Sequence, residues 1–264
     1  MTGVLAFIGR NTLQLVRYLD GLYDLTEKSA YWTFVAPLKG RGLKWGGAVH
    51  QMVLAGVNSI PIVSLISLFI GIILALQGAY QLQKFGAAYY VTALVGVSMT
   101  RELGPLITAI VIAGRSGSAF AAEIGTMKVA EEIDALEAMG LNSVKYLVVP
   151  KYLAMLVMMP CLTLISDLAG ILGGGLFEIW QLDQSYFTFL FATRDALVMR
   201  DIWTGLIKSL IFALIITKVG CYEGFSVQGG AEGVGKATTS SVVVSIFLII
   251  FADVVFTALF YYTA

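Results

Sequence analysis

An arginine and a glutamate, Arg101 and Glu102, stand side by side within a long apolar stretch of the sequence. A guanidinium there could bind the phosphate of a lipid, and a carboxylate could pair with a cation or relay a proton. Neighbouring helical residues point about 100° apart, so these two side chains cannot form one neat pair with each other. Pro105 cannot donate to the Arg101 carbonyl, which predicts a kink there. The two charges are candidates for a ligand site, and the alternative is a structural brace between helices.

Three further charged residues interrupt apolar stretches, and we interpret all three as braces between helices rather than as transport residues. Lys208 is expected near the outer end of its span, where its side chain can snorkel to the interface. Asp253 is deeper and is expected to pair with Lys208 or Arg101. Asp167 precedes the segment GILGGG, whose small residues favour close helix packing.

A charged, glycine-punctuated run, GRSGSAFAAEIGTMKVAEEIDALEAMG, occupies Gly114–Gly140 between two apolar stretches. An acidic segment should be repelled by anionic lipid and should therefore project from the membrane. A solvated loop helix is the simplest interpretation. Helical spacing, however, predicts an apolar stripe that needs a covering surface, and a second stripe of acids. Gly140 can cap the helix. A partner protein that docks on this helix would cover both stripes. The apolar stripe comprises Val129, Ile133, Leu136 and Gly140, and the acidic stripe comprises Glu131, Asp134 and Glu137.

The composition predicts an all-α integral membrane protein. Of 264 residues, 58% are hydrophobic and 13% are charged, and the mean hydropathy is +0.84, whereas soluble domains are about a quarter charged. The formal net charge of zero argues against a nucleic-acid partner. His50, Cys161 and Cys221 are too isolated to predict a metal site or a disulfide framework. The N-terminal sequence lacks the pattern of a cleaved signal peptide, so we expect an uncleaved chain.

About five apolar stretches are long enough to cross a bilayer core of about 30 Å as helices. Residues 1–50 are assigned to an N-terminal helical segment and residues 51–264 to the transmembrane domain. The segment GVLAFIGRNTLQLVRYLDGLYDL is too interrupted by charge to span, so it predicts a helix in the interface, or alternatively a soluble helix packed on the rest. The expected spans fall within Met52–Leu82, Tyr89–Ile112 (continuing towards Ala122), Val144–Phe177, Ile202–Val219 and Val242–Tyr262.

The basic residues predict the orientation. With the N-terminus in the cytoplasm, the outer loops carry only Lys84, Arg194 and Arg200, which satisfies the positive-inside rule. The acidic run is then cytoplasmic. The inner segments carry Arg10, Arg17, Lys28, Lys39, Arg41, Lys44, Arg115, Lys128, Lys145, Lys151, Lys218 and Lys236.

Three stretches resemble the MlaE/YrbE-type permeases, the membrane subunits of lipid ABC transporters that work with MCE-domain proteins. They are TRELGPLITAIVIAGRSGSAFAAEIGTMKVAEEIDALEAMG, GIILALQG and GKATTSSVVVSIFLIIFADVVFTALFYY. The resemblance covers most of the chain after Gln51. It implies that the loop between the second and third spans is a coupling helix that docks on an ATPase. The residues that would form this contact are Val129, Glu131, Ile133, Asp134, Leu136 and Glu137.

The same resemblance implies a homodimer that works with two ATPase subunits, a STAS-domain regulator and a periplasmic MCE-domain hexamer. The substrate would be phospholipid, exchanged between a Gram-negative inner membrane and periplasmic carriers to maintain outer-membrane lipid asymmetry. ATP and magnesium would be held by the ATPase and no cofactor by this chain. Arg101 and Glu102 would border the lipid pathway, with Gln77, Leu82 and Phe85 at the outer end of the first span.

Other functions are less well supported by the sequence. The segment GAEGVGKA resembles a phosphate-binding P-loop, but Ala237 stands where the motif requires serine or threonine. A membrane-embedded enzyme would require a cluster of catalytic side chains, and the single histidine has no paired acids near it. A proton-coupled secondary transporter could use Glu102 and Asp253 as relays, but it would usually show two repeated halves.

Overall fold

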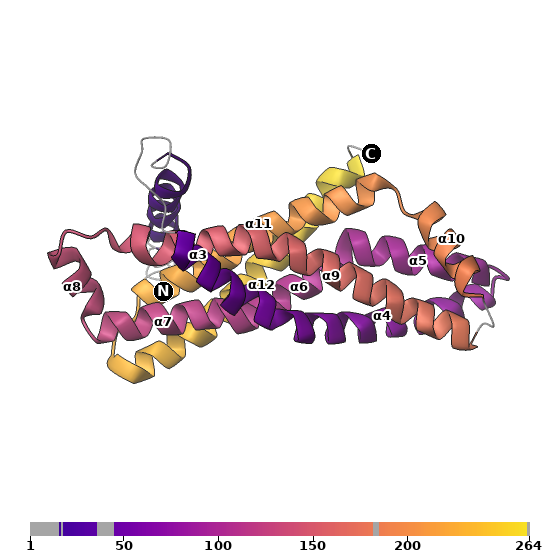
Figure 1. Cartoon of the computed structure of the whole chain (residues 1–264), viewed down its shortest axis with the longest axis horizontal. Coiled ribbons are helices and arrows are strands. Elements are labelled where there is room, and N and C mark those ends of the chain that lie inside the picture. The colour runs from indigo at the N-terminus through magenta and orange to yellow at the C-terminus, as the bar shows by residue number, and fades with distance from the viewer. Residues whose placement is uncertain (1–15, 17, 36–44, 182–184, 263–264) are drawn as a thin grey trace, which may run out of the picture.

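The computed structural model describes residues 16, 18–35, 45–181 and 185–262, and all regular structure in these ranges is helical. Five helical runs are long and apolar enough to cross a membrane, which confirms the predicted fold class. They lie side by side in an elongated bundle (Figure 1). The runs are Trp45–Gln83, Ala88–Val129, Val144–Gln181, Met199–Phe225 and Gly230–Tyr262.

The first two runs alternate between α-helix and tighter or wider turns. The first contains α3 (Trp45–Gln51), a π-helical turn (Met52–Gly56), a 3₁₀ turn (Val57–Ser59) and α4 (Ile60–Gln83). The second contains a 3₁₀ turn (Ala88–Tyr90), α5 (Val91–Ser98), a π-helical turn (Met99–Leu103), α6 (Gly104–Ile112), a second π-helical turn (Ala113–Gly117) and α7 (Ser118–Val129).

The remaining runs are more regular. A π-helical turn (Val144–Val148) leads into α9 (Val149–Gln181), and the last two spans are α11 (Met199–Phe225) and α12 (Gly230–Tyr262). Two short helices lie outside the spans at opposite ends of the bundle, α8 (Glu132–Ala138) and α10 (Tyr186–Ala196) (Figure 1). We call these the α8 end and the α10 end. The charge pattern did not predict α10, because it falls in the expected outer loop.

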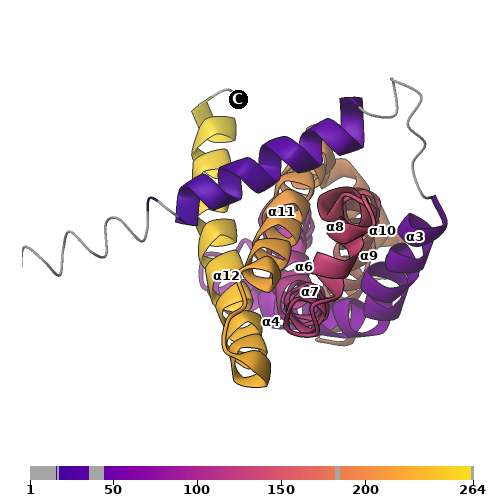
Figure 2. The same cartoon turned by 90° about the vertical axis from the view of Figure 1, so that its left-hand side faces the viewer.

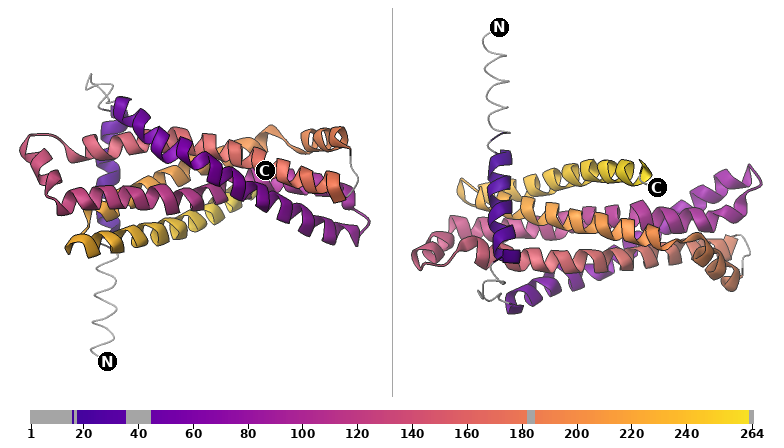
Figure 3. Two further views of the ribbon diagram at one scale, coloured as in Figure 1. Left: turned by 60° about the horizontal axis from the view of Figure 1, so that its bottom comes forward. Right: turned by 90° about the horizontal axis from the view of Figure 1, so that it is seen from above.

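The N-terminal helix at residues 18–30 crosses the α8 end at a steep angle to the spans, as an interfacial helix would (Figures 2 and 3). The Tyr18 hydroxyl donates to Glu223 of α11 at 2.9 Å, and its ring meets Tyr222 edge-on. Burial and the Glu223 carboxylate raise the pKa of Tyr18, which keeps the hydroxyl a donor. The predicted N-terminal segment before residue 16, with residue 17, lies outside the described residues.

The first span begins earlier than predicted, because α3 starts at Trp45 and runs without a break into α4. The charge-free stretch between His50 and Lys84 had placed the span within Met52–Leu82. The structure continues the helix through them, and Ala48 is fully buried. Lys39, Arg41 and Lys44 lie outside the described residues.

Close packing of α4 on α9 depends on glycine, as the GILGGG segment predicts. A Cβ at Gly71 would lie 1.9 Å from the Gly170 carbonyl oxygen, and one at Gly173 would lie 2.2 Å from that of Leu68. Any larger residue would force the backbones apart. Between these helices the hydroxyls of Ser67 and Ser166 share a hydrogen bond of 2.7 Å.

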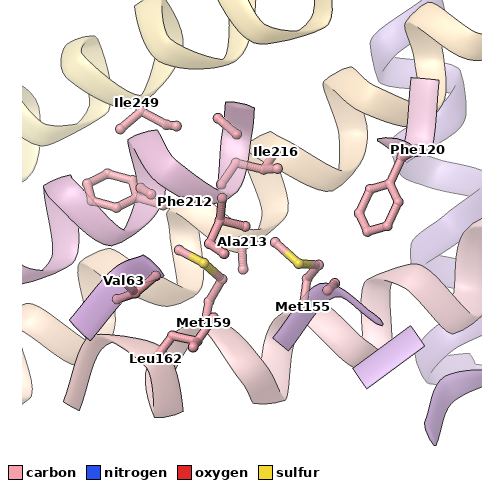
Figure 4. Packing of buried hydrophobic residues seen from close by; sticks show 13 residues of the cluster. Val63, Phe120, Met155, Met159, Leu162, Phe212, Ala213, Ile216 and Ile249 are labelled. Carbon is pink, nitrogen blue, oxygen red and sulfur yellow. The ribbon is translucent and has the colours of Figure 1, made fainter. Parts of the chain in front are cut away.

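The largest buried cluster among the described residues contains side chains from all five spans, including Phe120 of α7 (Figure 4). Met155 and Met159 of α9 face Phe212 and Ile216 of α11, with Ile249 of α12 closing the cluster on another side. The outer face of α12 is different, since only 11% of its most apolar window is buried within the chain. That face is left for lipid or for another protein.

Candidate functional site

The charged pair predicted as a ligand site lies in the π-helical turn Met99–Leu103. The N–H of Gly104 bonds to the carbonyl of Met99, five residues back, which is the π pattern. Pro105 follows immediately and has no N–H to bond to Arg101. The irregularity therefore lies where Pro105 predicts it, and it takes the form of a widened turn. Such turns often mark functional positions in a helix.

Arg101 pairs with Asp201, a residue that the sequence analysis did not single out. The Arg101 Nε donates to the Asp201 carboxylate, which is 1% exposed, while the Arg101 side chain is 50% exposed. The other carboxylate oxygen accepts from the Val198 N–H at 3.1 Å and so caps the start of α11. Asp201 thus holds one edge of the guanidinium and leaves the rest accessible.

A second ion group connects three spans through Lys208. Its ammonium contacts the Glu102 carboxylate, lies 2.9 Å from Asp253 Oδ1 and donates to the Thr257 hydroxyl at 2.8 Å. The option that Lys208 snorkels to the interface is wrong, because its side chain is only 1% exposed, and the contacts are those of a brace between spans. Two acids from neighbouring spans compensate its charge inside the bundle. Asp253 was expected to pair with Lys208 or Arg101, and the structure pairs it with Lys208.

Both ion groups border one pocket of about 160 Å³. It is lined by Arg101, Glu102, Arg200, Thr204, Lys208, Thr257, Phe260 and Tyr261. The ion groups contain two cations and three acids, and Arg200 adds a third cation, so the formal charges of the pocket and its partners cancel (3 − 3 = 0). The exposed half of the Arg101 side chain and the rings of Phe260 and Tyr261 nevertheless face this pocket together.

Asp167 lies at a different place from these ions. Its carboxylate is 6% exposed and packs against Gly104, at the junction between the π-helical turn and α6. Within the described residues its Oδ1 has no hydrogen-bond partner. Asp167 therefore contacts the second span through close packing, and the ion groups do not include it.

The structure does not bring Gln77, Leu82 and Phe85 into this pocket within one chain. Leu82 packs on a separate cluster that includes Ala79 and Val91. Phe85 follows the end of α4 and is 82% exposed. The expectation that these residues border the same lipid pathway therefore gains no support from the geometry of a single chain.

The acidic run forms two helices, so the prediction that one helix carries both the apolar and the acidic stripe is wrong. α7 ends at Val129, and Glu131 adopts a left-handed conformation with φ of 58° before α8 begins. The predicted cap is found, since Gly140 has φ of 73° and its N–H bonds to the Glu137 carbonyl at 2.9 Å. The break turns Val129 away from the stripe on α8.

The apolar face of α8 is already covered by this chain. Ile133 is 3% exposed and packs with Ile124, Val144 and Leu147, while Leu136 is partly buried on the same cluster. Assigning Ile133 to a partner contact was wrong for this reason, because spacing alone does not identify the covering surface. The acids and large apolar residues still exposed on this loop are Val129, Glu131, Glu132, Asp134, Glu137, Met139 and Leu141, and the basic Lys128 is exposed beside them.

The P-loop-like segment forms the first turns of α12, where Lys236 pairs with Glu232 at 2.7 Å. A helix start of this kind is not the strand-to-helix loop that cradles phosphates. Within the described residues no group of three or more histidines, cysteines or acids could hold a metal ion. Cys161 and Cys221 are both unpaired.

Comparison with known proteins identifies the family. Residues 48–259 match the profile described as Permease MlaE. The chain belongs to this family. It is 38% identical over 254 residues to a probable ABC transporter permease protein of Rickettsia bellii, which covers 96% of each chain. It is also 38% identical over 220 residues to a probable ABC transporter permease protein of Synechocystis, covering 83% of each. A third relative, the chloroplastic protein TRIGALACTOSYLDIACYLGLYCEROL 1 of Arabidopsis thaliana, is 35% identical over 85% of this chain and 64% of its own.

The MlaE-family chain is therefore a multi-pass membrane permease. Permeases of ABC transporters are non-catalytic membrane subunits, so membership implies an ATPase partner. The proton-coupled alternative is not favoured by these relatives. In the structure both of its candidate acids, Glu102 and Asp253, contact Lys208.

Proposed function

We propose that the chain is the permease subunit of an ATP-driven transporter that moves phospholipid between the inner membrane of a Gram-negative bacterium and periplasmic carriers. This exchange would maintain the lipid asymmetry of the outer membrane. The observation that carries the proposal is the half-exposed Arg101 guanidinium, held on one edge by buried Asp201. A guanidinium with free donors suits a phosphate oxygen better than any other common headgroup atom.

The pocket around Arg101 fits a phospholipid in a second respect. Phe260 and Tyr261 of α12 provide apolar surface beside the charges, so a phosphate and the start of an acyl chain could be held together. One relative supports a lipid substrate, because the name of the Arabidopsis protein contains that of a diacylglycerol glycolipid. Gln77, Leu82 and Phe85 belong to the proposed pathway only where a second copy of the chain completes it.

We place the ATPase contact on the loop that contains α8. Its exposed acids, Glu131, Asp134 and Glu137, would face basic residues at the rim of an ATPase groove, and exposed Val129 would add apolar contact. Ile133 and Leu136 would support this surface from inside by anchoring α8. ATP and magnesium would be bound by the ATPase and not by this chain.

The proposed assembly is a homodimer with two ATPase subunits, a STAS-domain regulator and a periplasmic MCE-domain hexamer. The exposed apolar face of α12 is compatible with a second permease copy. The N-terminus and the α8 end would face the cytoplasm. This orientation leaves Lys84, Arg194 and Arg200 at the opposite, α10 end.

Transport by the reconstituted complex tests the proposal. Proteoliposomes containing the full assembly should exchange fluorescent phospholipid with added carrier protein only when ATP is present. Arg101→Gln should reduce this rate about tenfold or more, because a charge-assisted hydrogen bond to the phosphate contributes about 1.5–3 kcal/mol. Lys236→Gln removes an exposed charge that is paired with the equally exposed Glu232, and it should leave the rate unchanged. A normal rate for Arg101→Gln at normal abundance would contradict the assigned headgroup site.

A further inference from the structure

A second cationic pocket lies between the first two spans, nearer the α8 end than the Arg101 pocket. It has a volume of about 210 Å³. Arg115 provides its central charge, 14 residues after Arg101 in the same helical run, or about 21 Å along it at 1.5 Å per residue. The two arginines are thus separated by much of a bilayer core of about 30 Å. The pocket is lined by Gln51, Leu54, Ala55, Asn58, Arg115, Ser116, Ala119, Phe120 and Glu123.

Both walls of this pocket depart from α-helical geometry. Arg115 lies in the π-helical turn Ala113–Gly117, and the facing wall contains a π-helical and a 3₁₀ turn in succession. The Ala55 carbonyl accepts from the hydroxyls of Ser59 at 2.7 Å and Ser116 at 3.4 Å, which ties the two walls together. The second span contains two arginines, Arg101 and Arg115, and each lies in a π-helical turn beside a pocket.

Most of the Arg115 guanidinium has no partner in the described part of the chain. Its Nη1 donates to the Ser59 hydroxyl at 2.5 Å, and no acid among the described residues forms an ion pair with it. A guanidinium has five N–H donors, so a ligand with several acceptor oxygens could still bind. The one acid in the pocket, Glu123, is paired with buried Lys151 at 2.9 Å. Arg115 and Lys151 are cations and Glu123 is an acid, so the net formal charge of these three residues is +1.

We infer that this pocket binds a phosphate group through Arg115, with the amides of Gln51 and Asn58 as further donors. A phospholipid headgroup at the α8 end is one source of that phosphate, and a free phosphate anion is another. Only the role of the pocket in transport rests on the proposed function. In that role it would be a second binding site for a lipid headgroup on the same helix. Arginine fits because its planar fork can hold Ser59 with one edge and a phosphate with the other.

Photocrosslinking of lipid tests the pocket in the assembled full-length complex. A benzophenone residue replaces Leu54 in the pocket wall, and the probes are radiolabelled phosphatidylglycerol and a diacylglycerol with the same acyl chains. We expect preferential capture of phosphatidylglycerol, and we expect Arg115→Gln to reduce that capture about tenfold, which corresponds to about 1.4 kcal/mol. At exposed Val157 a benzophenone should capture both lipids equally with or without Arg115.

Two further experiments distinguish lipid phosphate from free phosphate and the Arg115 pocket from the Arg101 pocket. For free phosphate, the detergent-solubilised chain should gain thermal stability with inorganic phosphate, and Arg115→Gln should lose this gain. Asn58→Leu keeps the Arg115–Ser59 bond and should weaken either effect, which guards against a folding defect in Arg115→Gln. A benzophenone at Thr204 reports on the Arg101 pocket, so failure there with capture at Leu54 would contradict the proposed function alone. The inference is overturned if phosphatidylglycerol is not preferred at Leu54 and inorganic phosphate gives no stabilisation that depends on Arg115.

Discussion

Gly104 and Asp167 are in such close contact that no side chain fits between them: a Cβ on Gly104 would lie 1.7 Å from Asp167 Oδ1. The contact joins α9 to the second span directly after the π-helical turn that holds Arg101 and Glu102. It therefore fixes the position of that turn against the third span. The position of the two charged residues therefore depends on Gly104, a residue that has no side chain.

Gly104→Ala should destabilise the protein because the added methyl group overlaps a buried carboxylate. Overpacking of this kind costs about 1–3 kcal/mol and should lower the thermal midpoint of the purified protein. Gly114→Ala is the matched control in the same span, since nothing lies within 4 Å of its Cβ position. That variant should be neutral or gain about 0.4–1 kcal/mol from a less flexible unfolded chain. Equal midpoints for both variants would contradict the close contact.

Removing the Lys208 ammonium should be among the most destabilising single changes at the ion groups. Lys208→Met leaves Glu102 and Asp253 without their shared cation, and breaking a buried pair in this way costs about 3–5 kcal/mol. Adding Glu102→Gln and Asp253→Asn to the same variant should recover part of the loss, because no uncompensated charge then remains. The measurement is the thermal midpoint in detergent. Lys236→Met, at an exposed pair, should cost no more than about 1 kcal/mol.

Arg101→Lys should separate the charge of Arg101 from its shape. A lysine keeps the charge but cannot hold Asp201 with one edge while presenting further donors to a phosphate. We expect about tenfold weaker equilibrium binding of fluorescent phosphatidylglycerol with little change in thermal midpoint. Arg194→Lys, an exposed residue of α10, is the control and should bind as the unmodified protein does. If Arg101→Lys also binds normally, a point charge is sufficient at this site.

Recovery of the ATPase with immobilised permease should distinguish the outer from the inner face of α8. Reversing Glu131, Asp134 and Glu137 to lysine should release the ATPase, because it adds repulsion to lost attraction. Val129→Asp should also weaken recovery, since Val129 is exposed and its change need not unfold the loop. Ile133→Asp should instead lower the amount of folded permease, because it places a charge in a buried cluster. Normal recovery by both surface variants would place the ATPase contact elsewhere.

The five spans could be predicted from the sequence because the length of an apolar run is a strong constraint in a bilayer. Each predicted range lies within the corresponding helix. Their ends were less predictable, as α3 shows, since a helix can continue beyond the hydrocarbon. Pro105 indicated where the second span would be irregular, but not that the irregularity would be a π-helical turn.

The partners of the charged residues were harder to predict. Asp201 was missed because it lies 100 positions from Arg101 and directly before the predicted fourth span, where it reads as an ordinary helix cap. Lys208 was misplaced because hydropathy gives depth but not the direction a side chain faces. Ile133 was misassigned because an apolar stripe indicates that a covering surface exists, and only the fold shows that the surface belongs to the same chain.

The second span runs without interruption from Ala88 to Val129, so the Arg101 turn and the start of the α8 loop belong to one helical run. Their angular relationship is therefore set by the number of residues between them. One residue inserted in α7 would rotate the loop by about 100° relative to Arg101 while lengthening the run by only about 1.5 Å. An insertion of seven residues would nearly restore the angle but displace the loop by about 10 Å. The number of residues in α7 thus sets the angle between the proposed ATPase contact and the ion groups. This is a constraint on helix length and not on side-chain identity.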